Sequence, residues 1–489
     1  SMIPEEQAKE LKAICFLFTG PELRVGAVSP TDVKVKELVY QLGERNKASA
    51  AVYKITEHSF EKAFGLYATL PKIKAIIKGV RITDEELSRY TAMIKDFPAI
   101  QKLLQEASTT DVMTIVVAAA LELGSSDIHI EAEEAGVKVR LRVDGLLQDV
   151  ALLPVEAWKK IISRIKLIAG LKININDKPQ DGRFTIFLKN EKVDVRTSTL
   201  PTAYGESVVM RILESGSIKL ELEKLGIRPK MYEKFKKEVD KPHGMIITTG
   251  PTGSGKTTTL YAVLQKLNQA DVKIITLEDP VEYKVAGINQ SQIDHTKDYT
   301  FAKGLRSILR QDPDIVMVGE IRDLETAEIA IQAALTGHLM LSTIHTNDAA
   351  GAIPRFLSMG VKPFLLAPAL NAIIGQRLVR KIHEPCKEEM TLEPEVLEKV
   401  KAVLTDIPAT SGEVIDLSNL KFYRGKGCDI CNHSGYKGRL GIYELLLMSP
   451  DVEKAVLTGN VSEYEMRDIA KAQGMLLMVQ DGLIKATEG

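Results

Sequence analysis

Residues 245–258, MIITTGPTGSGKTT, place a short apolar run directly before a loop with three glycines and a lysine. The segment Gly250–Thr257 fills every fixed position of the pattern GxxxxGK[ST]. Glycines let the backbone curl so that several N–H groups point at one phosphate, and the dipole of a following helix adds to that attraction. The alternative is an ordinary glycine-rich turn. We prefer a buried strand, a phosphate-binding loop and a helix, because all four fixed positions are filled in that setting.

The residues of this loop have separate expected tasks. Lys256 would reach the β- and γ-phosphates of a nucleoside triphosphate, and the Thr257 hydroxyl would be a ligand of Mg²⁺. The sequence therefore predicts ATP and Mg²⁺ as cofactors. The expected nucleotide-binding residues are Gly250, Pro251, Thr252, Gly253, Ser254, Gly255, Lys256, Thr257 and Thr258.

A second apolar run ends in a carboxylate. Ile315–Val318 is followed by Gly319 and Glu320, which predicts a buried strand with Glu320 at its end. A nucleotide site needs such a group to handle the metal or the attacking water. A solvated loop glutamate is the alternative, and the upstream phosphate loop makes it less favoured. The segment from Thr276 to Glu282 supplies another acidic cluster at a strand end.

The region after residue 245 has the pattern of an α/β domain. Short apolar runs, typical of parallel strands buried on both faces, alternate with helical patterns. One such helix, Leu324–Thr336, is expected to end at Gly337, a favourable C-terminal cap residue. The four predicted strands are Met245–Thr249, Lys273–Leu277, Ile315–Val318 and Leu339–Ile344.

Upstream, the patterning predicts two smaller domains. Alternation of apolar and charged residues over 137–144 and 193–196 predicts an antiparallel sheet with flanking helices. The charged segment 221–240 is expected to form a surface helix between domains. In the first hundred residues we expect strands at 15–18 and 25–28 and helices at 33–42 and 57–67. The predicted domains are 1–100, 101–225 and 226–489.

Composition limits the classes of partner. The formal net charge is −1, so no global basic field exists to hold nucleic acid or an anionic membrane. The longest apolar stretch, 112–121, is shorter than the about 20 residues that span a bilayer. The first residues lack the pattern of a secretory signal, so we expect a cytoplasmic protein.

Three of the four cysteines lie between residues 386 and 431. Cys428 and Cys431 form a CxxC pattern, and His383 and Cys386 form an HxxC pattern. Together they supply four nitrogen and sulfur ligands in two knuckles, the arrangement of a closed tetrahedral zinc site. A CxxC disulfide is the alternative. It is disfavoured in the cytoplasm and lacks the strand–helix context of a redox motif.

These motifs together resemble the ATPases that power type IV pilus assembly and type II secretion. The resemblance runs from about residue 110 to 489 and, more weakly, over the first hundred residues. It rests on GPTGSGKTTTLY (250–261), ITLEDPVEY (275–283), ILRQDPDIVMVGEIRD (308–323) and TGHLMLSTIHTNDA (336–349), and upstream on SSDIHIE, RLRVDG, PQDGRF and GESVVMRIL.

The resemblance implies roles for single residues. Glu320 would be the catalytic glutamate that orients water, and Glu278 would assist at the metal and water. Arg196 and Arg211 resemble arginine fingers supplied by the middle domain, with surface salt bridges as the alternative. His345 would sense the γ-phosphate, and a satisfied core histidine is the alternative.

The resemblance also implies a fold and partners. The fold would be a RecA-like P-loop ATPase domain, preceded by a PAS-like α+β middle domain and a small N-terminal α/β domain. A zinc-binding insertion would cover about 380–440, with His383 where relatives usually carry cysteine. The chain would form a homo-hexamer and contact an inner-membrane platform protein and a cytoplasmic adaptor, as a peripheral protein of the inner membrane.

Three other functions stay open at this point. A pilus retraction ATPase shares the core but lacks the cysteine knuckles and an N-terminal domain of this kind. A nucleic-acid motor shares the RecA-like core, but no basic stripe interleaved with aromatic residues is present. A nucleotide sensor without hydrolysis would not need the intact Lys256, Thr257 and Glu320.

Overall fold

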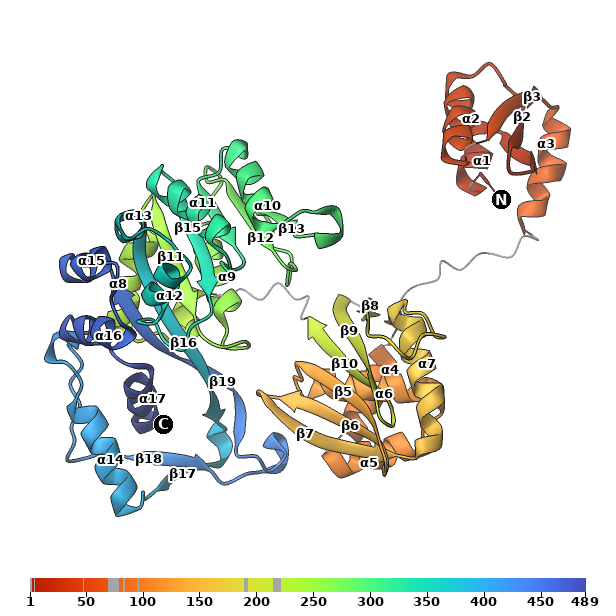
Figure 1. Cartoon of the computed structure of the whole chain (residues 1–489). Helices are drawn as coiled ribbons and strands as arrows, with labels where there is room; N and C mark the ends of the chain where they lie inside the picture. The colour runs from red at the N-terminus through yellow and green to blue at the C-terminus, as the bar shows by residue number, and fades with distance from the viewer. Residues whose placement is uncertain are drawn as a thin grey trace. The chain divides into compact units, whose positions relative to one another are not determined.

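The computed structural model describes all residues except 1, 4, 47, 69–78, 82–83, 95, 189–191 and 214–220. The chain divides into two compact units, Ser1–Ile77 and Lys78–Gly489 (Figure 1). The three-domain division of the sequence analysis stays a prediction.

The first unit is a small α/β fold. Its sheet has the order β1-β2-β3, with β1 and β2 antiparallel and β2 and β3 parallel. The parallel pair needs a crossover, and α2 supplies it. The strands and helices predicted here are confirmed to within a few residues. The elements are α1 (Glu5–Leu11), β1 (Ala13–Phe18), β2 (Glu22–Ala27), α2 (Val33–Asn46), β3 (Ser49–Lys54) and α3 (Glu57–Phe64).

The second unit begins with a seven-stranded sheet of order β4-β8-β9-β10-β5-β6-β7. Every pair of adjacent strands in this sheet is antiparallel except the pair β4 and β8. The predicted antiparallel sheet is therefore confirmed. Buried residues of the strands share one core with α4 to α7, so these helices cover a single face. The strands are β4 (Gly79–Arg81), β5 (Asp127–Glu133), β6 (Gly136–Val143), β7 (Leu146–Leu153), β8 (Gln180–Phe187), β9 (Lys192–Thr202) and β10 (Gly205–Leu213). The helices are α4 (Asp84–Met93), α5 (Phe97–Glu106), α6 (Thr109–Glu122) and α7 (Trp158–Ala169).

The rest of the unit is built on another seven-stranded sheet, of order β13-β12-β14-β15-β11-β16-β19. Every pair is parallel except β16 and β19. The four strands predicted from apolar runs are β11, β12, β14 and β15, and all four are confirmed. The strands are β11 (Gly244–Thr249), β12 (Ile274–Glu278), β13 (Asn289–Gln292), β14 (Ile315–Val318), β15 (Leu339–Ile344), β16 (Leu370–Ile382) and β19 (Tyr436–Leu447).

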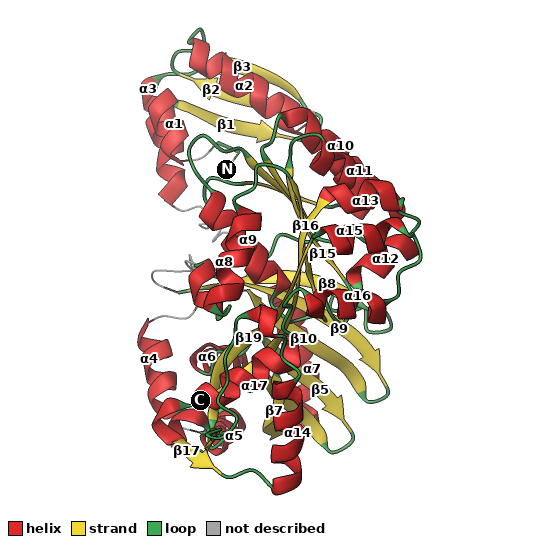
Figure 2. Cartoon of the chain, turned by 90° about the vertical axis from the view of Figure 1, so that its left-hand side faces the viewer, coloured by secondary structure: helices red, strands yellow, loops and turns green. Residues whose placement is uncertain are grey.

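Helices cover both faces of this sheet. In β11, Met245 and Ile247 join one core and Ile246 joins the other, because successive side chains of a strand point to opposite faces. In Figure 2, α8 and α9 lie on one side of the strands and α11, α12 and α13 lie on the other. One group is α8 (Pro229–Val239), α9 (Lys256–Leu267), α14 (Pro394–Thr405) and α17 (Met478–Glu488). The other is α10 (Phe301–Ile308), α11 (Leu324–Leu335), α12 (Ala352–Ser358), α13 (Pro363–Ala369), α15 (Pro450–Leu457) and α16 (Glu463–Ala472).

One sequence expectation needs correction. The segment 221–240 is not a single surface helix, because a short 3₁₀ turn (Leu222–Leu225) precedes α8, and α8 begins at Pro229. Met231, Phe235 and Val239 are buried at helical spacing. Their apolar stripe packs into a core, while the lysines that dominate the composition of the helix cover its outer face.

Strands β16 and β19 form a long two-stranded ribbon (Figure 1). Its inner half, residues 370–376 and 441–446, is buried in the sheet, and its outer half, 377–382 and 436–440, is partly or fully exposed. Beyond the outer end, β17 (Lys387–Met390) and β18 (Phe422–Gly425) form an antiparallel pair.

Helix α17 lies along the free edge of β19. The Asp481 carboxylate accepts a hydrogen bond from the Tyr443 backbone N–H (2.8 Å), and the Lys485 ammonium donates one to the Gly441 carbonyl (2.7 Å). Asp481 and Lys485 also form an ion pair, 2.7 Å apart. Two side chains of a helix therefore satisfy two backbone groups of an edge strand.

Among the described residues, none of the helices combines the length and the apolar character needed to cross a membrane.

Candidate nucleotide site and metal centre

The phosphate loop joins the end of β11 to the start of α9, as the sequence predicts. Gly250, Gly253 and Gly255 have φ angles of +143°, +78° and +88°, which side chains rarely adopt. A Cβ atom on Gly250 would lie 2.4 Å from the backbone oxygen of Gln376, so only glycine fits there. The Lys256 ammonium donates hydrogen bonds to the carbonyls of Gly250 (2.8 Å) and Pro251 (3.1 Å). The lysine therefore lies back over its own loop.

Three of the predicted residues meet at the carboxyl ends of neighbouring strands. Glu320 follows β14, and its carboxylate pairs with Arg322 (2.6 Å) and with Nε2 of His345 (3.3 Å). Burial lowers the pKa of Lys256, and the negative charge of Glu320 opposes that effect. The His345 side chain is 47% exposed, which disfavours the alternative of a satisfied core histidine. The structure therefore brings Glu320 and His345 into contact, with Lys256 close enough to Glu320 to feel its charge.

Glu278 lies at the end of β12 but faces other groups. It is 3% exposed, and its carboxylate accepts hydrogen bonds from the hydroxyls of Thr276 and Tyr261 and from the Gln290 amide. Burial raises the pKa of Glu278. None of these donors belongs to the phosphate loop. The structure therefore connects Glu278 to the α9 residue Tyr261, and does not bring it to Lys256.

The two predicted fingers, Arg196 and Arg211, face each other in register on β9 and β10. Arg196 donates to the Val281 carbonyl (2.8 Å) and lies 3.4 Å from the Glu282 carboxylate, so it contacts the acidic segment after β12. Arg211 pairs with Asp127 of its own sheet (2.9 Å) and is 57% exposed. Ion pairs, the alternative considered for both residues, are what this structure shows.

The sequence analysis missed residues that hold the loop after β15, on which His345 lies. The Thr249 hydroxyl accepts a hydrogen bond from the Thr346 backbone N–H (3.1 Å) and donates to its carbonyl (3.1 Å). Glu444, which is 2% exposed, accepts from the backbone N–H groups of Ala349 and Met478. A carboxylate within the apolar run 442–447, IYELLL, is the sequence signal that could have identified Glu444.

The pKa of Glu444 depends on its burial and on two neighbouring charges, Asp348 and Arg467. Burial raises its pKa to about 7, and the negative charge of Asp348 acts in the same direction. The two backbone N–H donors and the Arg467 guanidinium oppose this shift. Arg467 itself pairs with Asp348 and Glu463. The buried carboxyl thus connects the loop after β15 with strand β19 and the start of α17.

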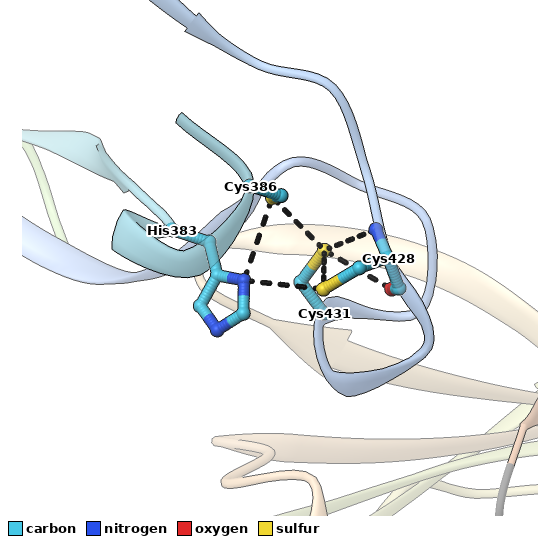
Figure 3. Close-up of side chains that lie close together, drawn as sticks. All are labelled: His383, Cys386, Cys428 and Cys431. Carbon is cyan, nitrogen blue, oxygen red and sulfur yellow. Dashed lines mark hydrogen bonds between the residues drawn. The ribbon is translucent and has the colours of Figure 1, made fainter. Parts of the chain in front are cut away.

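The four predicted metal ligands converge at the outer end of the β16–β19 ribbon (Figure 3). His383 and Cys386 follow β16, and Cys428 and Cys431 precede β19. Nδ1 of His383 lies 3.5 Å from Sγ of Cys386 and 3.4 Å from Sγ of Cys428. Sγ of Cys431 lies 3.7 Å from that of Cys428 and 3.9 Å from that of Cys386. All four ligand atoms lie within 4.8 Å of one another.

These separations fit a tetrahedral ion. With Zn–S near ~2.3 Å and Zn–N near ~2.0 Å, the edges of a tetrahedron are about 3.8 Å between sulfurs and about 3.5 Å between sulfur and nitrogen. The backbone N–H groups of Cys428 and Gly435 donate to Sγ of Cys431. Burial opposes ionisation of that thiol, yet hydrogen bonds from the backbone and the neighbouring thiols lower its pKa to about 7. All four cysteines are free, so the disulfide alternative is not what this structure shows.

The fold and the loop define a P-loop nucleotide-binding α/β protein. A family model described as "Type II/IV secretion system protein" matches residues 102–489. This chain belongs to that family.

The curated relatives carry names from two branches. The chain is 46% identical over 396 residues to the type II secretion system protein E of Xanthomonas campestris, covering 81% of this chain and 68% of that protein. It is 41% identical over 457 residues to the type IV pilus assembly ATPase PilB of Thermus thermophilus. That match covers 94% of this chain and 48% of the relative, so this chain spans about half the relative's length. The PilB of Myxococcus xanthus is 37% identical over 496 residues, covering 100% of this chain and 84% of that protein.

Solved structures agree on the fold alone. The ATPase DotB of Legionella pneumophila has a TM-score of 0.56 at 20% identity, covering 78% of this chain and 94% of that one. The ATPase DotB of Yersinia pseudotuberculosis has a TM-score of 0.55 at 18% identity, covering 79% and 93%.

Proposed function

We propose that this chain is an ATP-hydrolysing motor subunit that powers assembly of type IV pili or of the related type II secretion pseudopilus. The observation that carries the proposal is the meeting of Lys256, Glu320 and His345 at the carboxyl ends of adjacent parallel strands. That edge of a parallel sheet is where ligands bind in open α/β folds. The names of the relatives indicate which process ATP hydrolysis would power, namely type IV pilus assembly or type II secretion.

The proposed chemistry divides among few residues. ATP and Mg²⁺ supply the γ-phosphoryl group and the cation that offsets its charge. Lys256 leaves the Gly250 and Pro251 carbonyls and bonds to phosphate oxygens instead. The backbone N–H groups of residues 250–258 surround the phosphates, and the Thr257 hydroxyl is a ligand of Mg²⁺. Glu320 orients the attacking water, and His345 reports on the γ-phosphate. Glu278 assists from the end of β12 by way of α9.

The two arginines are proposed to act on the transition state. Arg196 and Arg211 lie on adjacent strands of the sheet that precedes the P-loop domain, so one rigid movement of that sheet would carry both. An arginine that arrives on closure couples domain motion to hydrolysis. That movement would break the ion pair of Arg196 with Glu282. Asp127, in contrast, moves with Arg211 on the same sheet, so the Arg211 side chain would have to leave Asp127 to reach the phosphates. We assign a PAS-like fold to that domain and a RecA-like fold to the ATPase domain.

The metal is proposed to be zinc, held by His383, Cys386, Cys428 and Cys431. Three thiolates and one imidazole suit zinc better than magnesium or calcium, which prefer oxygen ligands. All four ligands come from the protein, so the site is closed and structural rather than catalytic.

The proposed assembly is a homo-hexamer at the cytoplasmic face of the inner membrane. Its partners would be an inner-membrane platform protein and a cytoplasmic adaptor of the pilus or secretion machine, which makes the chain a peripheral membrane protein. The near-neutral net charge argues against nucleic acid as the substrate of the motor. The names of the relatives favour assembly and secretion over retraction.

ATP turnover with and without single-stranded DNA tests this function. We expect Mg²⁺-dependent turnover that DNA does not stimulate, and no turnover in Lys256→Ala. Arg196→Ala and Arg211→Ala should each lower kcat while ATP affinity stays within a few fold, because fingers act mainly on the transition state. Strong stimulation by DNA would favour the nucleic-acid motor, and binding without turnover would favour a nucleotide sensor.

A further inference from the structure

Gln376 is a buried polar residue that the proposed chemistry does not use. It lies on β16, is 1% exposed, and follows Gly375, the β16 residue paired with the last residue of β11. Its amide nitrogen donates to the Ser254 carbonyl (2.7 Å), and its amide oxygen accepts from the Thr259 hydroxyl (2.8 Å). One side chain therefore bonds both to the phosphate loop and to the first turn of α9.

The backbone carbonyl and the side-chain amide of Gln376 also lie close to two glycines of the loop. A Cβ on Gly250 would meet the Gln376 carbonyl oxygen, and a Cβ on Gly255 would lie 3.0 Å from the Gln376 amide nitrogen. Gln376 thus contacts the beginning and the end of the loop as well as the helix that follows. In contrast, the Ser254 hydroxyl is buried and has no hydrogen-bond partner among the described residues. The Ser254 side chain therefore does not anchor the loop in the way that Gln376 does.

We propose that Gln376 is a positioning residue that holds the phosphate loop and the start of α9 in the geometry that receives a nucleotide. The inference rests on the proposed function of the loop. A carboxamide both donates and accepts, and these two bonds require one of each. An ionised glutamate in its place accepts only, and a leucine of similar size does neither. The loop is set before the nucleotide arrives, which reduces the ordering cost of binding.

A matched control lies on the same strand. Asn371 is also a buried amide of β16, 8% exposed, and it donates to the His243 carbonyl (3.0 Å), next to the first residue of β11 and away from the loop. Gln376→Leu and Asn371→Leu each remove a buried amide from β16. A general loss of stability would affect both variants, whereas a loss of loop geometry would affect only the first.

The experiment measures the binding of a fluorescent ATP analogue with Mg²⁺, the steady-state kcat and KM for ATP, and the melting temperature. We expect Gln376→Leu to weaken nucleotide binding and raise KM by about 10-fold, with kcat within about 2-fold, because the loop grips ground state and transition state alike. Asn371→Leu should bind as the wild type does, even where its melting temperature falls. Gln376→Glu keeps the bond from Thr259 but sets a buried carboxylate against the Ser254 carbonyl and near the phosphates, so it should bind nucleotide at least as weakly as Gln376→Leu.

The experiment distinguishes failure of the proposed function from failure of the role proposed for Gln376. Absence of nucleotide binding by the wild-type protein would contradict the proposed function itself. Wild-type binding together with unchanged affinity in Gln376→Leu, or with equal losses in Gln376→Leu and Asn371→Leu, would contradict only the role of Gln376. If Gln376→Leu does not fold, Gln376→Glu gives the same comparison through its KM.

Discussion

The two halves of the β16–β19 ribbon have similar lengths and belong to one antiparallel strand pair, but they are held in different ways. The inner half is buried between helices on both faces and carries Gln376 and Glu444, whose side chains bond to the two loops of the nucleotide site. The outer half leaves the core, and its end carries the cluster of His383 and three cysteines. Burial of apolar side chains stabilises the first half. The second half has little apolar surface to bury, and the proposed zinc ion would replace what the core does not supply there.

The outer half retains a few local contacts. The Arg380 guanidinium lies over the Tyr436 ring, 4.0 Å from its centre, and the His383 backbone N–H donates to the Gly435 carbonyl (3.0 Å). The pairing is irregular between Arg380 and Ile382. Contacts of this kind at exposed positions contribute about 0.5–1 kcal/mol each, so they hold the outer end of the ribbon only weakly. We therefore expect substitutions at the inner end to change ATP turnover, and substitutions at the outer end to change metal content and local order.

The largest expected difference between the two ends is in ATP turnover. Glu320→Gln should lower kcat by about 100-fold or more while ATP stays bound, because an amide cannot orient and activate water as a carboxylate does. Cys428→Ser, at the outer end, should leave kcat within about 2-fold of wild type, because the phosphate loop is held by its own buried sheet. Single-turnover and steady-state assays measure both. Comparable losses of kcat in the two variants would show that the ends are coupled.

The next effect concerns metal and local order. Metal analysis should find close to one zinc per chain in wild type, and less in Cys428→Ser. Limited proteolysis after chelation should cut first beside the two knuckles and spare both the strands of the sheet and α14, because Val400 and Leu404 hold α14 in the core while the knuckles would depend on the ion. Cys15→Ser is the matched control, since that thiol lies in the other unit and outside the cluster. Protein without metal that resists proteolysis there would contradict the zinc site.

The smallest expected effect is a pH dependence at the inner end. Burial raises the pKa of Glu444 to about 7 from 4.5, so the folded state holds its proton more tightly than the unfolded state does. The resulting stability is present in full below pH 4.5 and is lost as pH rises through 7, by at most about 3 kcal/mol. Asp348 and Arg467 are the charged groups that face it.

Denaturant unfolding of wild type and Glu444→Gln at pH 5 and pH 8 measures this effect. Glutamine does not titrate, and its NH₂ group cannot accept from one of the two N–H donors, so the variant should be less stable at pH 5. The advantage of wild type should shrink toward pH 8. Glu453→Gln, an exposed carboxylate on α15, should show no such convergence. A constant difference between wild type and Glu444→Gln would mean that this carboxyl does not titrate in the range.

The sequence predicted the parallel strands beside the inner half of the ribbon and the cluster of ligands at its outer end. Apolar runs identified the four central strands, because parallel strands buried on both faces have that composition. The spacing of His383, Cys386, Cys428 and Cys431 predicted a cluster that the structure brings together. Zinc ligands come in short knuckles, so their local spacing carries the information even when the knuckles lie far apart in the chain.

The buried side chains that bond to the two loops, Gln376 and Glu444, could not be assigned to their partners from the sequence. Gln376 bonds to Ser254, 122 positions away in the sequence, and Glu444 bonds to Ala349, 95 positions away. A single polar residue inside an apolar strand shows that some partner exists, because buried polar groups are paired. It does not show which backbone group that partner is. For the same reason the carboxylate of Glu278 could be placed at a strand end, but its turn toward Tyr261 could not be predicted.

The contact between α17 and β19 also covers an edge of the sheet that would otherwise be open. An edge strand exposes unpaired N–H and C=O groups, and a second chain can pair with them to extend the sheet. Asp481 and Lys485 bond to the outward groups of Tyr443 and Gly441, so a helix fills the place where another strand would dock. The apolar half of β19, IYELLL, would otherwise offer a six-residue segment of the kind that forms intermolecular sheets. Helix α17 therefore covers the edge of β19 at which a strand of another chain could otherwise pair.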